Sequence, residues 1–271
     1  MSRPPLLITS LSNDRIKAIR ALEMRKERKE TGLYVVEGAS ILMTAREHGH
    51  KPRTLVYRNG GIETGPARDL VDWALRERVE VLEVSPAVME KIAARDNPQS
   101  LLGVFQQSWA PLPPPSDVAR DATYVVLEEV RDPGNLGTIV RTADAVGAAG
   151  VVLVGTTCDP FSRECVRATM GSMFAVPLMR AAREDFLAWR AGWPGDVVGT
   201  HLDGGEDFRA AAYQMPALLV MGGEGPGLSD SLTRACTKLV KIPMAGRLDS
   251  LNLAVATALA LYQMRGPHLK L

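Results

Sequence analysis

The sequence predicts an α/β protein with two domains, the second of which holds a mostly parallel β-sheet. Three observations support this prediction. Short apolar runs alternate with helix-length segments along the chain, and the length of 271 residues exceeds that of one average domain. A proline-rich stretch, Trp109–Asp117, separates two such alternating parts. The apolar fraction of 46% is enough for a hydrophobic core in each part.

The proline-rich stretch predicts the domain boundary. Four of the five residues from Pro111 to Pro115 are proline, which excludes a regular helix or a central strand and favours a stiff, extended connector. We therefore predict a first domain over residues 1–108, a linker over 109–120 and a second domain over 121–271.

The first domain opens with one predicted amphipathic helix over Asn13–Lys29, capped by Ser12, Asn13 or Asp14. Strands and helices then alternate. They are expected at Leu33–Val36 (strand), Ala39–His48 (helix), Arg53–Tyr57 (strand), Ala67–Glu77 (helix) and Val79–Val84 (strand). This pattern is typical of a small α/β domain.

The second domain shows five short apolar runs, which is the pattern of strands that are buried on both faces of a parallel sheet. They are Thr123–Leu127, Val151–Val154, Asp196–Thr200, Leu218–Met221 and Leu239–Ile242. Ligands of open α/β sheets bind at the carboxyl ends of strands. The loops that follow strand ends, residues 128–136, 200–205, 222–228 and 243–250, are therefore candidate site elements.

Overall charge gives no argument for nucleic-acid binding by the chain as a whole, and the cysteines do not suit a disulfide scaffold or a structural metal site. The net charge is only +1, yet residues 1–30 carry eight cations against four acids, Arg3, Arg15, Lys17, Arg20, Arg25, Lys26, Arg28 and Lys29 against Asp14, Glu23, Glu27 and Glu30. This segment is either a solvated helix face or a face that contacts RNA. Three cysteines without metal-ligand spacing predict reduced thiols and no structural metal. Because no run resembles a signal peptide or a membrane span, we expect a cytoplasmic protein.

A first group of candidate site residues follows Thr123–Leu127. Asp132-Pro133-Gly134 is a turn sequence, Asn135 starts a helix, and Arg141 lies nearly two turns along it. A fixed guanidinium suits a phosphate or a carboxylate ligand. The alternative, which spacing alone favours, is an ion pair of this arginine with Asp144 or Glu128.

A second group is the glycine loop Gly222–Leu228 around Glu224. It matches neither a P-loop nor a dinucleotide fingerprint, which disfavours nucleoside triphosphates and NAD. Glycines allow the backbone to approach a ligand closely. The alternative is a tight strand-to-helix turn without a ligand.

A third group is Ile242-Pro243-Met244 together with Ser250 and Asn252. Proline ends the strand and leaves carbonyl groups free to accept from an adenine or an amino group. Ser250 is expected to cap the alanine-rich helix that starts near Asn252. The amide of Asn252, close to an apolar helix, needs a hydrogen-bonding partner.

Together and in this order, the three groups resemble the sequence motifs of the SpoU/TrmH family of SPOUT methyltransferases. Asn135-x-Gly137-x-x-x-Arg141 is similar to motif one, Gly222–Leu228 to motif two, and Ile242–Met244 with Ser250-Leu251-Asn252 to motif three. The resemblance covers residues 123–265. In the first domain, Gly32–Gly38 resembles the ribosomal-protein-like substrate-binding domain that often precedes this catalytic domain.

The resemblance implies an S-adenosylmethionine-dependent enzyme that methylates a ribose 2′-hydroxyl of structured RNA, with 23S rRNA preferred over tRNA. It also implies that Gly222, Ile242, Leu251 and, less directly, Thr200 hold the cofactor, and that the chain end forms a trefoil knot. A homodimer is implied as well, in which Arg141 faces the cofactor of the partner. The competing interpretation is an RNA-binding protein of the same fold without catalysis; methylation of a base nitrogen is disfavoured.

The chemistry of the ribose hydroxyl constrains the implied roles. This hydroxyl is a poor nucleophile near neutral pH, and a guanidinium is a reluctant proton acceptor. We therefore expect Arg141 to hold the neighbouring phosphate and stabilise the incipient alkoxide. Asn135, Glu224, Ser250 and Asn252 are expected to order the loops and the nucleophile, with Glu224 as the rival base.

Overall fold

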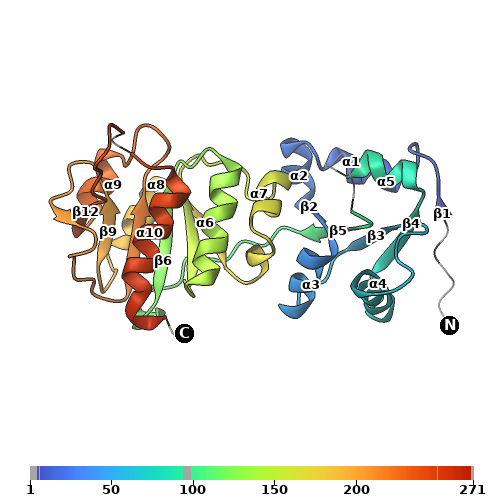
Figure 1. Cartoon of the computed structure of the whole chain (residues 1–271), viewed down its shortest axis with the longest axis horizontal. Helices are drawn as coiled ribbons and strands as arrows, with labels where there is room; N and C mark the ends of the chain where they lie inside the picture. The colour runs from blue at the N-terminus through green and yellow to red at the C-terminus, as the bar shows by residue number, and fades with distance from the viewer. Residues whose placement is uncertain (1–4, 6, 94–98, 249, 270–271) are drawn as a thin grey trace. The chain divides into compact units, whose positions relative to one another are not determined.

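The computed structural model describes residues 5, 7–93, 99–248 and 250–269, and it divides into two compact units (Figure 1). The first unit contains residues 1–107 together with Asp159–Phe174. The second contains residues 108–158 and 175–271. The short segment Asp159–Phe174 thus belongs to the first unit although it lies deep within the second half of the sequence, which no sequence pattern indicated.

The first unit has a mixed sheet of order β1-β4-β3-β5-β2, in which β1, β4 and β3 are parallel and β5 and β2 are antiparallel to their neighbours. Its elements are β1 (Leu7–Ile8), α1 (Asp14–Ala21), α2 (Arg25–Thr31), β2 (Leu33–Glu37), α3 (Ala39–Glu47), β3 (Thr54–Arg58), α4 (Pro66–Arg76), β4 (Glu80–Val84), α5 (Pro86–Ile92), β5 (Leu101–Gln106), α7 (Arg163–Ala168) and the short helix η2 (Ser172–Phe174). One core cluster joins α1 and α5 to the sheet through Ile16, Val56 and Met89.

The predicted single helix over Asn13–Lys29 is wrong, because the chain forms two helices. Asn13 caps α1 as expected, but Met24 is extended and α2 starts after it. Arg28 explains the break. Its Nη1 donates to the carbonyl oxygens of Leu22 and Glu23, at 2.8 Å each, so these groups are bonded without a continuing helix.

The second unit has seven parallel strands in the order β10-β12-β9-β11-β6-β7-β8, which confirms the predicted mostly parallel sheet. Its elements are η1 (Pro115–Asp117), β6 (Thr123–Glu128), α6 (Pro133–Ala145), β7 (Gly150–Val154), β8 (Leu178–Ala181), α8 (Arg183–Arg190), β9 (Val197–Thr200), β10 (Glu206–Asp207), β11 (Ala217–Met221), α9 (Asp230–Ala235), β12 (Lys238–Lys241), α10 (Leu253–Arg265) and η3 (Gly266–His268). All five predicted strands are present. Sequence reasoning missed the two outermost strands, β8 and β10, because an edge strand lacks a long apolar run.

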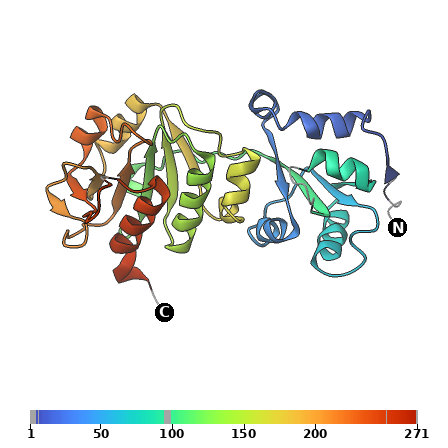
Figure 2. The same ribbon diagram turned by 45° about the horizontal axis from the view of Figure 1, so that its top comes forward.

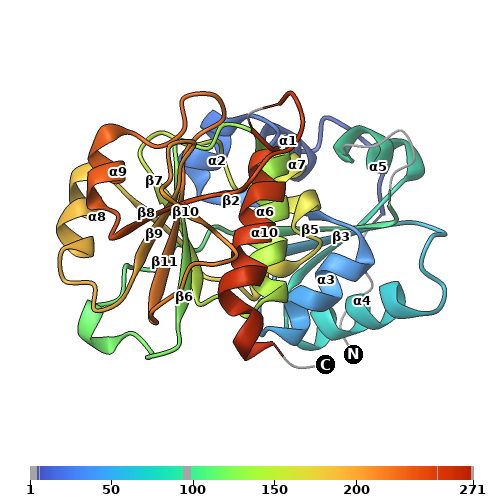
Figure 3. The ribbon, with the colours of Figure 1, turned by 60° about the vertical axis from the view of Figure 1, so that its left-hand side comes forward.

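Helices cover both faces of this sheet, as Figures 2 and 3 show. α6 and α10 pack side by side on one face, and α8 and α9 pack on the other. The central strands β6, β7 and β11 are buried along their whole length. This burial on both faces is the physical reason for their continuous apolar sequences.

The proline-rich stretch has no regular secondary structure up to Pro114, ends in the short helix η1 and packs against the rest of the second unit. Trp189 donates from Nε1 to the carbonyl of Pro113 at 2.6 Å, and the backbone amide of Ala110 donates to Leu178 at 2.8 Å. Leu112 and Val118 contact the core of the same unit. Residues 109–118 therefore form part of the second unit's surface.

Two further features bear on function. No helix in the described part of the chain is both long and apolar enough to cross a bilayer. The described residues also hold no group of three or more histidine, cysteine or acidic side chains placed to bind a metal ion.

Candidate active site

Four loops meet at the carboxyl edge of the second unit's sheet because its strands are parallel. β11 lies between β9 and β6, and β12 lies on the other side of β9. The loops after these strands line a cavity of about 640 Å³, within the range of roughly 300–1,000 Å³ typical of small-molecule sites. Every predicted site residue except Arg141 lines it: Asn135, Thr200, Gly222, Glu224, Ile242, Ser250, Leu251 and Asn252.

The glycine loop between β11 and α9 is closed by its own backbone. A Cβ atom on Gly222 would lie 2.0 Å from the carbonyl carbon of Gly227, and one on Gly223 would lie 3.0 Å from the carbonyl oxygen of Glu129. Gly225 and Gly227 have positive φ angles, 98° and 70°. The loop therefore needs glycine to fold back on itself, which leaves the Glu224 side chain directed at the start of α6.

A hydrogen-bonded relay joins the three sequence groups. Glu224 accepts from the backbone amide of Arg131 and from Nδ2 of Asn135, each at 3.0 Å. Asn135 in turn accepts at Oδ1 from Nδ2 of Asn252 at 2.9 Å. Asn135 thus uses its amide as a donor on one side and as an acceptor on the other, and this fixes the orientation of its side chain.

These bonds set the ionisation of Glu224. Partial burial alone would raise its pKa, but the hydrogen bonds from Asn135 and from the backbone amides of Arg131, Glu224 and Asp132 outweigh burial and lower the pKa. Glu224 is therefore an ionised carboxylate at neutral pH with both oxygens occupied. Such a group is a weak base.

Asn252, and not Ser250, caps α10. Its Oδ1 accepts from the backbone amides of Ala254 and Val255, at 2.9 and 3.2 Å. The expected capping by Ser250 is wrong, because the helix begins one residue after Asn252. Ser250 is exposed at the rim of the cavity.

Arg141 lies on α6 outside this cavity and is exposed. It forms no hydrogen bond or ion pair with any described residue, so the alternative pairing with Asp144 or Glu128 is not present. Glu128 instead binds Arg183. The guanidinium of Arg141 is thus available to a ligand or to another chain.

Sequence reasoning considered Glu128 only as a possible partner of Arg141, but in the structure it anchors the far end of the glycine loop. This carboxylate is 3% exposed and accepts from both the backbone amide and the hydroxyl of Ser229, at 2.8 and 2.7 Å. Nε of Arg183 supplies a charged partner at 2.9 Å. An acid directly after an apolar strand was the available signal, since a buried carboxylate needs several donors.

Three polar residues in the cavity wall were also missed: His201, Asp203 and Lys241. His201 and Asp203 belong to the loop that follows β9, which was predicted as a site element but with Thr200 as its one named site residue. The hydroxyl of Thr200 is directed at the sulfur of Met221, 3.4 Å away. Among the described lining residues, Lys241 is the one cation.

The basic segment at residues 1–30 is largely engaged in ion pairs within the first unit. Arg3 lies outside the described residues. Four other cations pair with acids: Arg15 with Glu80, Lys17 with Asp14, Lys26 with Glu30, and Arg28 with Asp159. The RNA-contacting interpretation is wrong for Arg28, which is 5% exposed. Arg20 and Lys29 are exposed and form no ion pair with the described residues.

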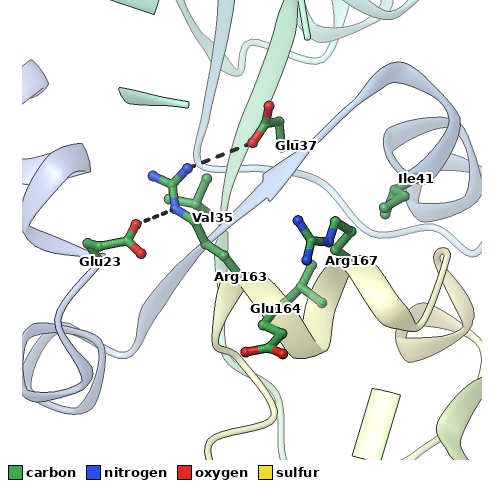
Figure 4. A pocket seen from close by; sticks show the side chains of 8 residues that line it. Glu23, Val35, Glu37, Ile41, Arg163, Glu164 and Arg167 are labelled. Carbon is green, nitrogen blue, oxygen red and sulfur yellow. Dashed lines mark ion pairs between the residues drawn. The ribbon is translucent and has the colours of Figure 1, made fainter. Parts of the chain in front are cut away.

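The first unit has a smaller cavity, of about 190 Å³, between β2 and α7 (Figure 4). The guanidinium of Arg163 lies between the carboxylates of Glu23 and Glu37, at 2.8 and 3.9 Å. Burial is the main influence on Arg163 and lowers its pKa despite these neighbours. Because acids outnumber cations in its lining, this cavity does not suit an anion.

Comparisons with known proteins match both units. The model of the SpoU rRNA Methylase family matches residues 122–262, which include all four loops of the large cavity. The model of the MRM3-like substrate binding domain matches residues 13–103 in the first unit.

Individual relatives match over nearly the whole chain. The 23S rRNA (uridine(2479)-2'-O)-methyltransferase of Streptomyces viridochromogenes is 32% identical over 255 residues, 88% of this chain and 84% of that protein. The 23S rRNA (guanosine(2553)-2'-O)-methyltransferase of Bacillus subtilis is 27% identical over 96% of this chain and 99% of that protein. The crystal structure of an AdoMet-bound rRNA methyltransferase from Sinorhizobium meliloti has a TM-score of 0.89 and 45% identity, and the match covers 98% of this chain and 99% of that one.

Proposed function

The chain belongs to the SpoU rRNA Methylase family, and we propose that it transfers a methyl group from S-adenosylmethionine to a ribose 2′-hydroxyl of large-subunit ribosomal RNA. One observation carries this proposal. The relay from Glu224 through Asn135 to Asn252 joins the three motif segments at the wall of a cavity large enough for a nucleoside cofactor.

The cavity suits S-adenosylmethionine in both shape and lining. Apolar side chains such as Ile242 and Leu251 lie beside the open backbone of the glycine loop, and a few polar groups converge on the same space. Gly222, Ile242 and Leu251 would hold the cofactor through their backbone, with Thr200 beside them. When bound, the cofactor supplies an electrophilic methyl group on a sulfonium sulfur.

Methyl transfer forms a bond between the ribose oxygen and the methyl carbon and breaks the bond from sulfur to that carbon, so that S-adenosylhomocysteine leaves. The hydroxyl proton passes to solvent water. The protein must therefore stabilise a developing negative charge on the ribose oxygen. Arg141 suits this task, because it is exposed and has no partner among the described residues. It would hold the adjacent phosphate and the incipient alkoxide with its planar set of donors.

Glu224 is assigned a positioning role. Both of its oxygens accept hydrogen bonds and its pKa is lowered, which supports an anchor for the glycine loop rather than a proton acceptor. Asn135 and Asn252 hold the start of α6 against the start of α10. Ser250, exposed at the cavity rim, would meet the RNA or the cofactor directly.

The enzyme acts as a homodimer in this proposal. α10 exposes an apolar stripe, Val255, Leu259 and Tyr262, at the helical spacing of four and three residues. α6, which carries Arg141, packs beside α10. A second copy that covers the stripe would place its own cavity near this arginine, which fits the two-fold symmetry of most dimers. A knotted chain end, implied by the family resemblance, stays a prediction.

The first unit would supply RNA affinity. Among the described residues of the basic segment, Arg20 and Lys29 are the exposed cations without an ion pair. Phosphate contacts by such residues make binding weaken with added salt. Charge reversal at both positions, with wild-type protein and a doubly substituted control at the already paired Lys17 and Lys26, tests this assignment. Loss of RNA affinity in the first variant only, with unchanged binding of S-adenosylhomocysteine, is the expected result.

The function is tested by incubating the protein with S-adenosylmethionine labelled in its methyl group and with RNA from a strain that lacks the protein. Label in 23S rRNA at a position that resists alkaline cleavage is the expected result, because ribose methylation blocks cleavage at that linkage. Label in tRNA instead of 23S rRNA would identify tRNA as the substrate. Binding of RNA without any transfer of label would identify a non-catalytic protein of the same fold. The site of action in this proposal is the cytoplasm, where such RNA is found.

A further inference from the structure

His201 follows the last residue of β9 and lines the same cavity as Glu224 and Ile242. We propose that Nε2 of His201 donates a hydrogen bond to a ribose hydroxyl of the nucleoside cofactor and thereby determines affinity for its adenosine part. This inference rests on the proposed function, because it assigns a further contact to the same cofactor.

The loop geometry fixes the tautomer of the neutral imidazole. The backbone amide of Asp203 donates to Nδ1 of His201 at 3.1 Å, and the Asp203 carboxylate lies 3.9 Å from the same nitrogen. Because Nδ1 accepts a hydrogen bond, the ring proton of the neutral imidazole is on Nε2. Nε2 forms no hydrogen bond with any described residue, and the side chain is only partly exposed, at 29%. The Nε2–H group of His201 is therefore a hydrogen-bond donor of fixed direction that a ligand can use.

The order of the strands decides which part of the cofactor lies near His201. β9 lies between β12 and β11, so its loop lies between the segment that begins at Ile242 and the loop that holds Glu224. In this inference, adenine lies against the segment that begins at Ile242, and the transferred methyl group lies near Glu224; both residues line the cavity. In the cofactor, the ribose connects these two parts. The ribose must therefore pass the carboxyl end of β9.

The charges in the cavity support the same assignment. The methionine carboxylate is the cofactor's one anionic group, and Lys241 is the one cation among the described lining residues. A neutral imidazole is the weaker partner for a carboxylate but a suitable donor to a hydroxyl group. The imidazole of His201 therefore suits a ribose hydroxyl better than the methionine carboxylate.

Two substitutions of His201 separate the contributions of its two ring nitrogens to binding. His201→Asn places an acceptor near the position of Nδ1 and keeps the turn to Asp203, but it removes the Nε2 donor. His201→Gln places an amide nitrogen near the position of Nε2. His48→Ala, an exposed histidine of the first unit, is the matched control. Calorimetry measures the binding of S-adenosylhomocysteine and of methylthioadenosine, which keeps the adenosine part but lacks the amino and carboxylate groups.

We expect His201→Asn to weaken both ligands by about threefold to tenfold, the effect of one neutral hydrogen bond. His201→Gln should retain more affinity than His201→Asn, and His48→Ala should bind as wild type. Wild-type affinity of His201→Asn for both ligands would overturn the proposal. Weakening of S-adenosylhomocysteine alone would also overturn it, because the contact would then be to the amino acid part. If the wild-type protein bound neither ligand, the proposed function itself would fail, and the two failures are therefore distinguishable.

Discussion

Asn252 donates a 2.9 Å hydrogen bond to Asn135, a residue 117 positions earlier in the chain. The same Asn252 caps α10 through its Oδ1, and the same Asn135 donates to Glu224. The starts of two helices and the glycine loop are therefore held by one pair of amide side chains. Loss of either amide should disturb all three segments together.

Asn135→Ala should lower both stability and cofactor affinity. It removes a donor from the ionised Glu224 and an acceptor from Asn252, and a hydrogen bond to a charged group contributes roughly 1.5–3 kcal/mol. Thermal unfolding and calorimetry with S-adenosylhomocysteine measure the two effects. Thr138→Ala, an exposed position of the same helix, is the control and should change neither. Equal affinity of Asn135→Ala and Thr138→Ala for S-adenosylhomocysteine would show that the hydrogen bonds of Asn135 do not shape the cavity.

Glu224→Gln should reduce turnover by the same factor at every pH between about 6 and 9. The pKa of Glu224 is lowered from its ordinary value of 4.5, so the group does not titrate in that interval. A basic or acidic limb of the pH profile that disappears in the variant would instead identify Glu224 as the base.

The same pKa shift predicts how the stability of the fold depends on pH. A carboxylate whose pKa is lower in the folded chain than in the unfolded chain stabilises the fold above the unfolded value of 4.5. This stabilisation is lost as the pH falls through the folded-state pKa. The difference in unfolding free energy between wild type and Glu224→Gln should thus be constant above about pH 5.5 and shrink below 4.5. Denaturant unfolding across this range measures it.

Arg141→Ala should abolish methylation and leave S-adenosylhomocysteine binding nearly intact, because Arg141 is exposed and does not line the cavity. Single-turnover methylation and calorimetry make the comparison. Arg234→Ala, an exposed arginine on α9, is the matched control and should retain full activity. Full turnover of the Arg141 variant would remove it from the mechanism.

Mixing two inactive variants should restore activity if each site uses both subunits. Arg141→Ala keeps the cavity, while Gly222→Ala keeps Arg141 but places a Cβ atom 2.0 Å from Gly227. After mixing and exchange of subunits, half of the dimers are mixed and one of their two sites is intact, so roughly one quarter of wild-type turnover is expected. If turnover did not recover although the two variants had exchanged subunits, Arg141 would act on the cavity of its own subunit.

Leu259→Lys should convert the dimer to a monomer, because Leu259 is at the middle of the exposed stripe on α10 and a buried, unpaired lysine is costly. Light scattering coupled to size exclusion measures the mass. Leu11→Lys, an equally exposed leucine of the first unit, should not change it. A wild-type protein that is itself monomeric would contradict the dimeric site.

The sequence by itself determined the strands of the catalytic sheet and the motif residues. Its apolar runs predicted β6, β7, β9, β11 and β12, since burial in the interior of a sheet requires a run of apolar residues that is visible in the local sequence. Asn135, Glu224 and Asn252 lie in three short motifs, which the sequence alone identifies through their resemblance to the SpoU/TrmH family. Edge strands β8 and β10 lack this signal and were missed.

Only the tertiary structure decided which side chains meet. Asn135 forms hydrogen bonds with Glu224, 89 positions away in the sequence, and with Asn252, 117 positions away. The order of the strands in the sheet, and not the order of residues in the sequence, brings these side chains together. The buried pair of Arg28 and Asp159, which draws the segment Asp159–Phe174 into the first unit, spans 131 positions. Composition could not distinguish this buried arginine from its solvated neighbours, because a charge is hidden only where a distant partner and free carbonyl groups compensate for the loss of water.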